Sequence, residues 1–231
     1  MKIHLLDNPI WNALETVHQA FATGTPTVKK YADDRLPFMA MPHYDGLHLG
    51  TIASYCRRDE IMFIKDALTT IPANWAIVDR INCLQMVYTP EAAALLPAGK
   101  EVVRLTAADQ EELFELVQLV QPGFFNRNTA ELGNYYGIRS EGKLVAVAGE
   151  RFKLDGFTEL SAICTHPEYT GKGYAQRLIT VLCAEILNQG AVPFLHVVDS
   201  NTRAIQIYER MGFQKRIDFP LLKLRYLGTG K

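Results

Sequence analysis

The sequence predicts an α/β (α+β) protein built around a mixed sheet with helices on its faces. Two observations support this fold class. From residue 101 onward, short runs typical of strands alternate with longer segments that have the periodicity of amphipathic helices. Turn signals at Glu141-Gly142 and Asp155-Gly156 join neighbouring strands directly, as in hairpins.

The second part of the chain gives a clear order of elements. Thr106 or Asp109 can cap a helix that places Leu113, Leu116 and Val117, with Val120, on one face. Two further helices are expected at about 173–188, ending at Gly190, and 201–211, ending at Gly212. Strands are expected at 101–105, 134–139, 143–148, 157–165, 194–198 and about 221–226.

The first part of the chain is predicted to be α/β but carries no motif that indicates chemistry. A helix is expected from Asn8-Pro9 to Phe21, and Asp45-Gly46 is interpreted as a hairpin turn. Strands are expected at 61–64, 75–78 and 83–88. Pro90 and the stretch 96–100 interrupt the pattern, so we expect one segment at 1–97 and a domain at 98–231.

Composition limits the possible functions. The 231 residues are 48% apolar and 21% charged, with a formal net charge of −1, which argues against general nucleic-acid or anionic-membrane binding. The four cysteines show no metal-ligand spacing and are too few for a disulfide framework, so no metal is expected. The chain has no signal-peptide pattern and no apolar run of spanning length, which predicts a cytoplasmic protein.

The most informative segment is the glycine turn at 166–175, between a predicted strand and a predicted helix. Gly171 and Gly173 permit a tight turn and close approach of a ligand, and the N–H groups that open the helix can bind an anion. Gln176 stands where a dinucleotide fingerprint needs a third glycine, and Tyr174 breaks the P-loop pattern. A phosphate or pyrophosphate site remains, with a plain capped turn as the alternative.

The next predicted helix carries a second pattern. Asn201, Ala204 and Tyr208 lie at i, i+3 and i+7, so they share one face over about two turns. The small side chain of Ala204 leaves room for a ligand between a polar group and a phenol. Taken alone, the same pattern would equally describe a helix face packed into a core.

Both segments resemble the GNAT superfamily of N-acetyltransferases, over roughly 130 residues. Residues 170–175 resemble its pyrophosphate loop, with Thr170 where glutamine or arginine is usual, and residues 201–213 resemble its NxxAxxxYxxxGF signature. The resemblance implies a mostly antiparallel GNAT sheet with helices on both faces. It also implies acetyl-CoA, or another acyl-CoA, as cosubstrate. The residues that would bind it are Ile163, Cys164, Thr165, Thr170, Gly171, Lys172, Gly173, Tyr174, Ala175, Asn201, Ala204 and Tyr208.

An amine acceptor must lose a proton before it attacks a thioester, so the site needs a base. Glu159, which shares a strand face with Ser161 and Ile163, is the first candidate. Glu150, at the end of the preceding strand, is the second, and His196, in an apolar strand, is the third. Tyr208 matches the family tyrosine that faces the leaving sulfur, and we interpret it as a hydrogen-bond donor to the thiolate.

The sequence does not specify the acceptor, which we expect to be a small-molecule amine, an amino acid or a peptide. Phe124-Phe125 and Tyr135-Tyr136 suggest an aromatic wall, with core packing as the alternative. The competing function is an acyl-CoA-binding module without turnover. Residues 1–97 are interpreted, by analogy with glycine N-acyltransferase-like proteins, as a diverged second GNAT-like half. A monomer and a homodimer are both compatible with the sequence.

Overall fold

The computed structural model describes residues 2–89, 99 and 101–228, and the expected boundary between residues 97 and 98 lies outside them. A seven-stranded sheet in the order β12-β6-β11-β10-β9-β8-β7 forms the centre of the molecule. Its strands are β6 (Cys83–Tyr88), β7 (Val102–Arg104), β8 (Tyr135–Ser140), β9 (Lys143–Leu154), β10 (Phe157–Thr165), β11 (Val192–Val198) and β12 (Phe213–Asp218). Within the described chain, its strand pairs are antiparallel except for β10 and β11.

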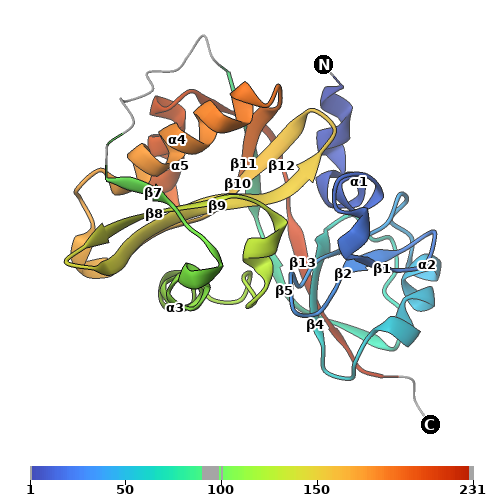
Figure 1. Ribbon diagram of the computed structural model, residues 1–231. Helices are drawn as coiled ribbons and strands as arrows, with labels where there is room; N and C mark the ends of the chain where they lie inside the picture. Colours follow the sequence, from blue (N-terminus) through green and yellow to red (C-terminus); the bar gives the residue numbers. More distant parts are fainter. Residues whose placement is uncertain (1, 90–98, 100, 229–231) are drawn as a thin grey trace.

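Helices cover both faces of this sheet, as Figure 1 shows. One face packs against α4 (Tyr174–Asn188) and α5 (Thr202–Arg210) through a core that includes Leu178, Leu182 and Met211. The other packs against α3 (Gln110–Val120) through Leu113 and Val117. The expected GNAT architecture, a mixed and mostly antiparallel sheet with helices on both faces, is therefore confirmed.

The N-terminal half lies beside the face that carries α3 and has two small sheets. One contains β1 (Ala22–Gly24), β2 (Lys29–Tyr31) and β3 (Met39–Ala40), and the other has the order β4-β13-β5. The second sheet is formed by β4 (Ile61–Lys65), β5 (Trp75–Ile81) and the C-terminal strand β13 (Leu221–Tyr226). The helices of the N-terminal half are α1 (Pro9–Glu15) and α2 (Gly46–Thr51). Short 3-10 helices lie at Ile3–Asp7, Gln19–Phe21, Ala53–Tyr55, Ala107–Asp109, Thr129–Leu132 and Pro167–Tyr169.

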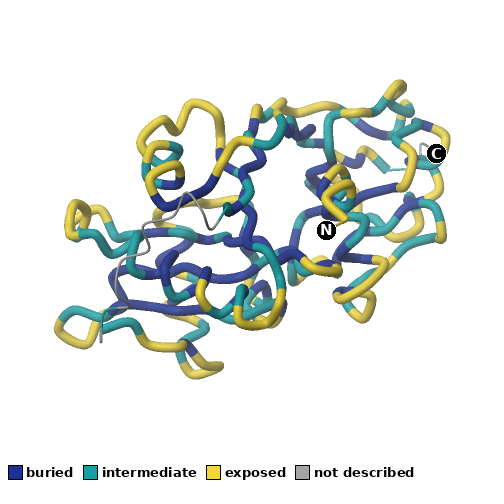
Figure 2. Tube along the Cα trace, turned by 90° about the horizontal axis from the view of Figure 1, so that it is seen from above, coloured by how far each residue is buried: buried dark blue, intermediate teal, exposed yellow. Residues whose placement is uncertain are grey.

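The two halves exchange strands. β6, from the N-terminal part of the chain, lies between β11 and β12, while β13, from the C-terminal end, lies between β4 and β5. A large apolar cluster joins the halves, with Ile10 and Phe38 on one side and Phe152 and Phe194 on the other. Figure 2 shows buried stretches running through both halves beneath exposed turns. The halves are thus tied together by main-chain hydrogen bonds as well as by a common core.

Three local expectations were wrong. The first helix ends at Glu15 rather than Phe21, because the chain turns to bury His18, which contacts the Tyr31 hydroxyl at 2.9 Å. Asp45 caps α2 by accepting a hydrogen bond from the His48 N–H at 3.0 Å, so Asp45-Gly46 is not a hairpin turn. β9 continues six residues beyond Ala148, and β12 was not anticipated.

Most other elements were predicted correctly, including α3–α5 and β13. The expected Thr106–Asp109 cap is present at the 3-10 helix Ala107–Asp109, which leads into α3: the Thr106 N–H and hydroxyl both bond to Asp109. Asp109, the N-cap of α3 itself, makes no side-chain hydrogen bond that caps α3. Leu113, Leu116 and Val117 are buried as predicted, whereas Val120 is 38% exposed. No helix in the described residues is both long and apolar enough to cross a membrane.

Candidate functional site

The loop between β10 and α4 turns on two glycines with positive φ. Gly171 has φ 81° and Gly173 has φ 75°, a conformation that side chains disfavour. A Cβ at Gly171 would meet no atom within 4 Å, and one at Gly173 would meet only Gln176 Oε1 at 4.0 Å. Gly173 is the N-cap of α4 and offers no side chain, so the N–H groups of the first turn stay open for an anion.

A cavity of about 440 Å³ lies over this loop and the start of α5. We call it the loop cavity. Of the cofactor-binding residues expected from the sequence, it is lined by Ile163, Thr165, residues 170–175, Asn201, Ala204 and Tyr208. Cys164 is not among its lining residues, because its side chain is buried in the core that faces α3.

Three cationic side chains border the loop cavity: Lys172, Arg203 and Arg210. They provide positive potential for a phosphate-rich ligand. Arg210 was not anticipated from the sequence, although it lies two residues after Tyr208 on the same helix. Arg177, in the first turn of α4, pairs instead with Glu101 and is not part of the lining.

The two central strands separate beside this cavity. β10 and β11 pair from Phe157↔Val192 to Leu160↔Leu195 and no further. Just beyond, Ala162 has φ 50° and the register of β10 against β9 shifts between Ser161 and Cys164. Beyond Leu160 the main chain of β10, including the part near Ile163, is unpaired on the β11 side.

A second cavity of about 370 Å³ opens on the other side of the separated strands. We call it the acceptor-side cavity. It shares four lining residues with the loop cavity: Ile163, Asn201, Ala204 and Tyr208. The two cavities therefore meet where β10 and β11 part. A long ligand in the loop cavity would reach the second cavity at this point.

Tyr208 lies at the junction, on α5. Its side chain is 9% exposed, and burial raises its pKa, so the phenol keeps its proton at neutral pH. Among the described residues, its hydroxyl has no hydrogen-bond partner within the protein. Asn201 caps the same helix by accepting a hydrogen bond from the Ala204 N–H at 3.2 Å, which fixes the helix start beside the loop.

Glu159 is fully buried and held by two neighbours. Arg151 Nε and Nη2 donate to its two oxygens at 2.8 and 2.7 Å, and His196 Nδ1 lies 2.6 Å from Oε1. Burial alone would raise the pKa of Glu159, but the charge and hydrogen bonds of Arg151, together with His196, lower it to about 2. Glu159 is therefore ionised but enclosed, and it lines neither cavity.

His196, by contrast, borders the acceptor-side cavity. Its Nε2 lies 3.1 Å from Gln85 Nε2. The Gln85 amide is oriented by donation to the Leu6 carbonyl at 2.9 Å and by acceptance from Arg216 at 2.9 Å. The Gln85 side-chain nitrogen must therefore donate to His196 Nε2, which accepts. The ring proton of His196 is then on Nδ1, facing Glu159.

Glu150 lies within β9, not at its end, because the strand is longer than expected. One carboxylate oxygen accepts from the Asn134 N–H at 2.8 Å and from Lys153 at 2.9 Å. Its other oxygen is buried with no partner among the described residues. Glu150 is fully buried and lines neither cavity, so the structure does not bring it together with Glu159 and His196.

Part of the acceptor-side cavity is built by the N-terminal half, through Phe38 and Cys83, beside Phe124. The Phe38 and Phe124 rings lie 6.1 Å apart. Phe124 is the one expected wall aromatic that lines this cavity; Phe125 and Tyr135 belong to the core facing α3, and Tyr136 to the core facing α4.

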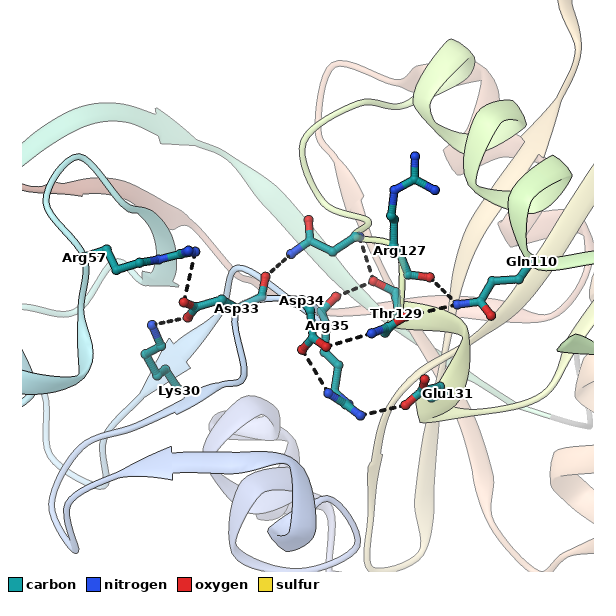
Figure 3. A network of polar contacts seen from close by, with 11 residues as sticks. Lys30, Asp33, Asp34, Arg35, Arg57, Gln110, Arg127, Thr129 and Glu131 are labelled. Carbon is teal, nitrogen blue, oxygen red and sulfur yellow. Dashed lines mark hydrogen bonds and ion pairs between the residues drawn. The ribbon is translucent and has the colours of Figure 1, made fainter.

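A clasp of polar contacts joins residues 33–35 to residues 126–131, next to the two segments that carry these rings. Asn126 donates to the Asp33 carbonyl at 2.8 Å, and Asn128 donates to Asp34 at 2.7 Å. Arg35 donates to Glu131 at 2.7 Å. Figure 3 shows Asp34, Arg35, Thr129 and Glu131 meeting across the two halves. Residues 33–35 come shortly before Phe38 in the chain and residues 126–131 shortly after Phe124, so the clasp joins the two segments that carry these rings.

Sequence reasoning missed Arg151, Gln85 and Phe38. For Arg151 the sequence does carry a signal. The turn at Asp155-Gly156 pairs residues 150–153 with Thr158–Leu160 across a hairpin. The positive charge at 151 and the negative charge at 159 are therefore neighbours on adjacent strands. Gln85 and Phe38 carry no comparable signal, since they reach the site through long-range packing.

Comparison with known proteins agrees with this geometry. A family profile described as FR47-like protein matches residues 135–219. The chain is 36% identical to the N-alpha-acetyltransferase RimI of Mycobacterium tuberculosis over 124 residues, covering 48% of this chain and 76% of that protein. The profile match includes the glycine loop, α4 and α5.

Solved structures extend the likeness to the whole chain. A protein from Novosphingobium aromaticivorans, assigned to the GNAT family of acetyltransferases, superposes with a TM-score of 0.87 at 28% identity, over 98% of this chain and 99% of its own. A GCN5-related N-acetyltransferase from Kribbella flavida has the same fold, with a TM-score of 0.64, 15% identity, and 96% and 94% coverage. The N-terminal half is therefore part of a shared architecture.

Proposed function

Because this chain belongs to the GNAT superfamily of N-acetyltransferases, we propose that it transfers an acyl group from an acyl-CoA, in the first instance acetyl-CoA, to a primary amine. The observation that carries the proposal is the meeting of two cavities at Tyr208, where β10 and β11 separate. One cavity suits a long phosphate-bearing donor, and the other has room for an acceptor.

The loop cavity would bind the CoA part of the donor. The pyrophosphate would lie against the main chain of residues 171–175 at the start of α4, near Lys172, Arg203 and Arg210. Hydrogen bonds from these main-chain N–H groups do not depend on the side chain of Thr170, whose hydroxyl donates to the Pro167 carbonyl at 3.2 Å. The pantetheine arm would then follow Thr165 and Ile163 toward the gap between the strands.

The reaction is a direct displacement at the thioester carbonyl. The amine nitrogen forms a bond to the carbonyl carbon, the carbon–sulfur bond breaks, and the electron pair leaves with the sulfur. A main-chain N–H freed by the bulge at Ala162 can stabilise the developing oxyanion. Tyr208 donates a hydrogen bond to the departing thiolate and keeps its own proton, since burial raises its pKa. The thiolate takes up the proton released by the amine.

We assign the role of base to His196. Of the three candidates, it borders the acceptor-side cavity, whereas Glu159 and Glu150 do not. The His196 nitrogen that accepts, Nε2, becomes available to the amine when its contact with the Gln85 N–H breaks. The Gln85 amide then still donates to the Leu6 carbonyl. Glu159 holds the ring proton on Nδ1 and stabilises the imidazolium that forms, as a positioning residue.

The experiment that tests the proposal is an acetyl-CoA turnover screen over amines, amino acids and peptides, with thiol release as the readout. We expect saturable, amine-dependent release that falls by ~10²-fold or more in His196→Ala while CoA affinity persists. CoA binding by calorimetry without release for any acceptor would favour a module that binds acyl-CoA without turnover. A folded His196→Ala protein with wild-type turnover would move the base elsewhere.

A further inference from the structure

Arg151 lines the acceptor-side cavity and, beyond its ion pair with Glu159, takes no part in the acyl transfer described above. Its guanidinium carbon is 5.0 Å from the centre of the Phe38 ring and 4.6 Å from that of Phe152. The side chain borders the cavity, although only 11% of its surface is exposed. Contact with two aromatic rings restricts the orientation of the guanidinium, which suits a recognition group.

Only one edge of this guanidinium is occupied. Arginine presents two pairs of parallel N–H donors, one along Nε and Nη2 and the other along Nη1 and Nη2. Glu159 takes the first pair, with distances of 2.8 and 2.7 Å. Among the described residues, no acceptor lies within hydrogen-bonding distance of Nη1. The second edge therefore remains available to a ligand in the cavity.

The rest of the lining indicates what the ligand carries. Among the described residues, Arg151 is the only fixed charge on the acceptor-side cavity, because the lining includes no aspartate, glutamate or lysine and no other arginine. Phe38, Val120, Phe124 and Leu221 give the cavity apolar walls. A planar donor pair matches a carboxylate, and apolar walls match an aliphatic or aromatic side chain.

We propose that Arg151 binds the carboxylate of the acceptor, so that the acceptor is an α-amino acid with an apolar side chain. This inference rests on the proposed function, since it names the substrate class of the same site. Glu159 already neutralises the arginine, which limits the strength of the second contact. We expect a preference of about tenfold to a hundredfold for a carboxylate over an uncharged amide, as for hydrogen bonds to charged groups.

The test compares three compounds that share one side chain: L-leucine, L-leucinamide and 3-methylbutylamine. Their binding to the CoA-saturated full-length protein is measured by calorimetry, which does not depend on turnover. Wild-type protein is expected to bind L-leucine at least ~10-fold more tightly than either of the other two. Equal affinity for L-leucine and L-leucinamide, or no binding of L-leucine, would overturn the inference.

Two variants then trace the preference to Arg151. Arg151→Lys keeps the positive charge but lacks the second donor pair, and it should lose most of the discrimination. Arg151→Gln combined with Glu159→Gln removes both charges and leaves no unpaired ion in the interior, which protects folding. Arg127→Lys, at a side chain that is 63% exposed, is the matched control and should keep the wild-type preference.

The two proposals fail in different ways. A folded Arg151 variant that still prefers L-leucine over L-leucinamide would contradict the role of Arg151, whatever the enzyme does with acetyl-CoA. Thiol release with amines that lack a carboxylate, at the same efficiency as with L-leucine, would contradict it too while supporting acyl transfer. Tight binding of L-leucine without any acyl transfer would uphold the carboxylate site and refute the proposed function.

Discussion

Replacing Glu159 by glutamine is expected to remove about 3 to 5 kcal/mol of folding stability at pH 7. The folded protein lowers the pKa of Glu159 from 4.5 to about 2, which corresponds to about 3 kcal/mol in favour of the charged, folded form. The variant also leaves the Arg151 cation in the interior without a counter-charge, for which about 3 to 5 kcal/mol is typical. Two independent routes therefore give similar magnitudes.

The pH dependence of this effect follows from the sign of the shift. Because the pKa is depressed in the folded state, the stabilisation is complete above about 4.5 and is lost as the pH falls toward about 2. Urea unfolding of wild type and Glu159→Gln at pH 7 and at pH 3 measures both quantities. The gap between the two proteins should be large at pH 7 and clearly smaller at pH 3.

The control is Glu111→Gln, which breaks an ion pair with Arg127 whose two side chains are 61% and 63% exposed. An exposed pair contributes less than about 1 kcal/mol, so this variant should unfold almost as wild type does. A loss below about 1 kcal/mol in Glu159→Gln, or a gap of the same size at both pH values, would refute the view that Glu159 and Arg151 form a tightly coupled buried pair.

Three further predictions concern the donor site and the N-terminal half. Tyr208→Phe should lower turnover about 10- to 100-fold through the lost hydrogen bond to the thiolate, with Tm and CoA affinity unchanged; an unaltered rate in kinetic assays would exclude the phenol from the mechanism. Gly173→Val should weaken CoA binding at least ~10-fold by calorimetry. Gly142→Val, which carries the same backbone strain at φ 82° in a hairpin turn, should not weaken it. Burial lowers the pKa of His18 from 6.5 to about 4. The free energy of unfolding should therefore fall by up to about 3 kcal/mol as the pH drops through that range. In urea titrations, His18→Gln should show a smaller dependence of stability on pH.

The exchange of β6 and β13 supports the interpretation of the N-terminal segment as a diverged GNAT-like half. In each half, a strand from the other half lies between two strands of the local sheet. β6 follows β5 in the chain, and β13 follows β12, so the crossing strand comes at the same point in both. We propose on this ground that the two halves descend from one repeated unit, with the donor site kept in the second.

Local features of the site were predictable because they depend on neighbours in the chain. The positive φ values of Gly171 and Gly173, the Asn201 cap and the shared face of Ala204 and Tyr208 all involve residues within a few positions of one another. The same reliance on local signals explains two errors. Asp45-Gly46 is as typical of a helix start as of a hairpin turn. Residues 16–21 continue the helical spacing of apolar residues, although the chain turns there to bury His18.

The sequence by itself determined the GNAT fold, the glycine loop and the helix that carries Tyr208, because a glycine turn and an amphipathic helix are formed by residues close together in the chain. Only the tertiary structure decided how the other side of the site is made. Strand exchange and the clasp of residues 33–35 with 126–131 bring Phe38 to Arg151 and Cys83 to His196, each pair more than a hundred residues apart in the chain. The same packing buries Glu159 in an ion pair with Arg151. A buried carboxylate must be paired, but the sequence pattern does not show which residue is its partner.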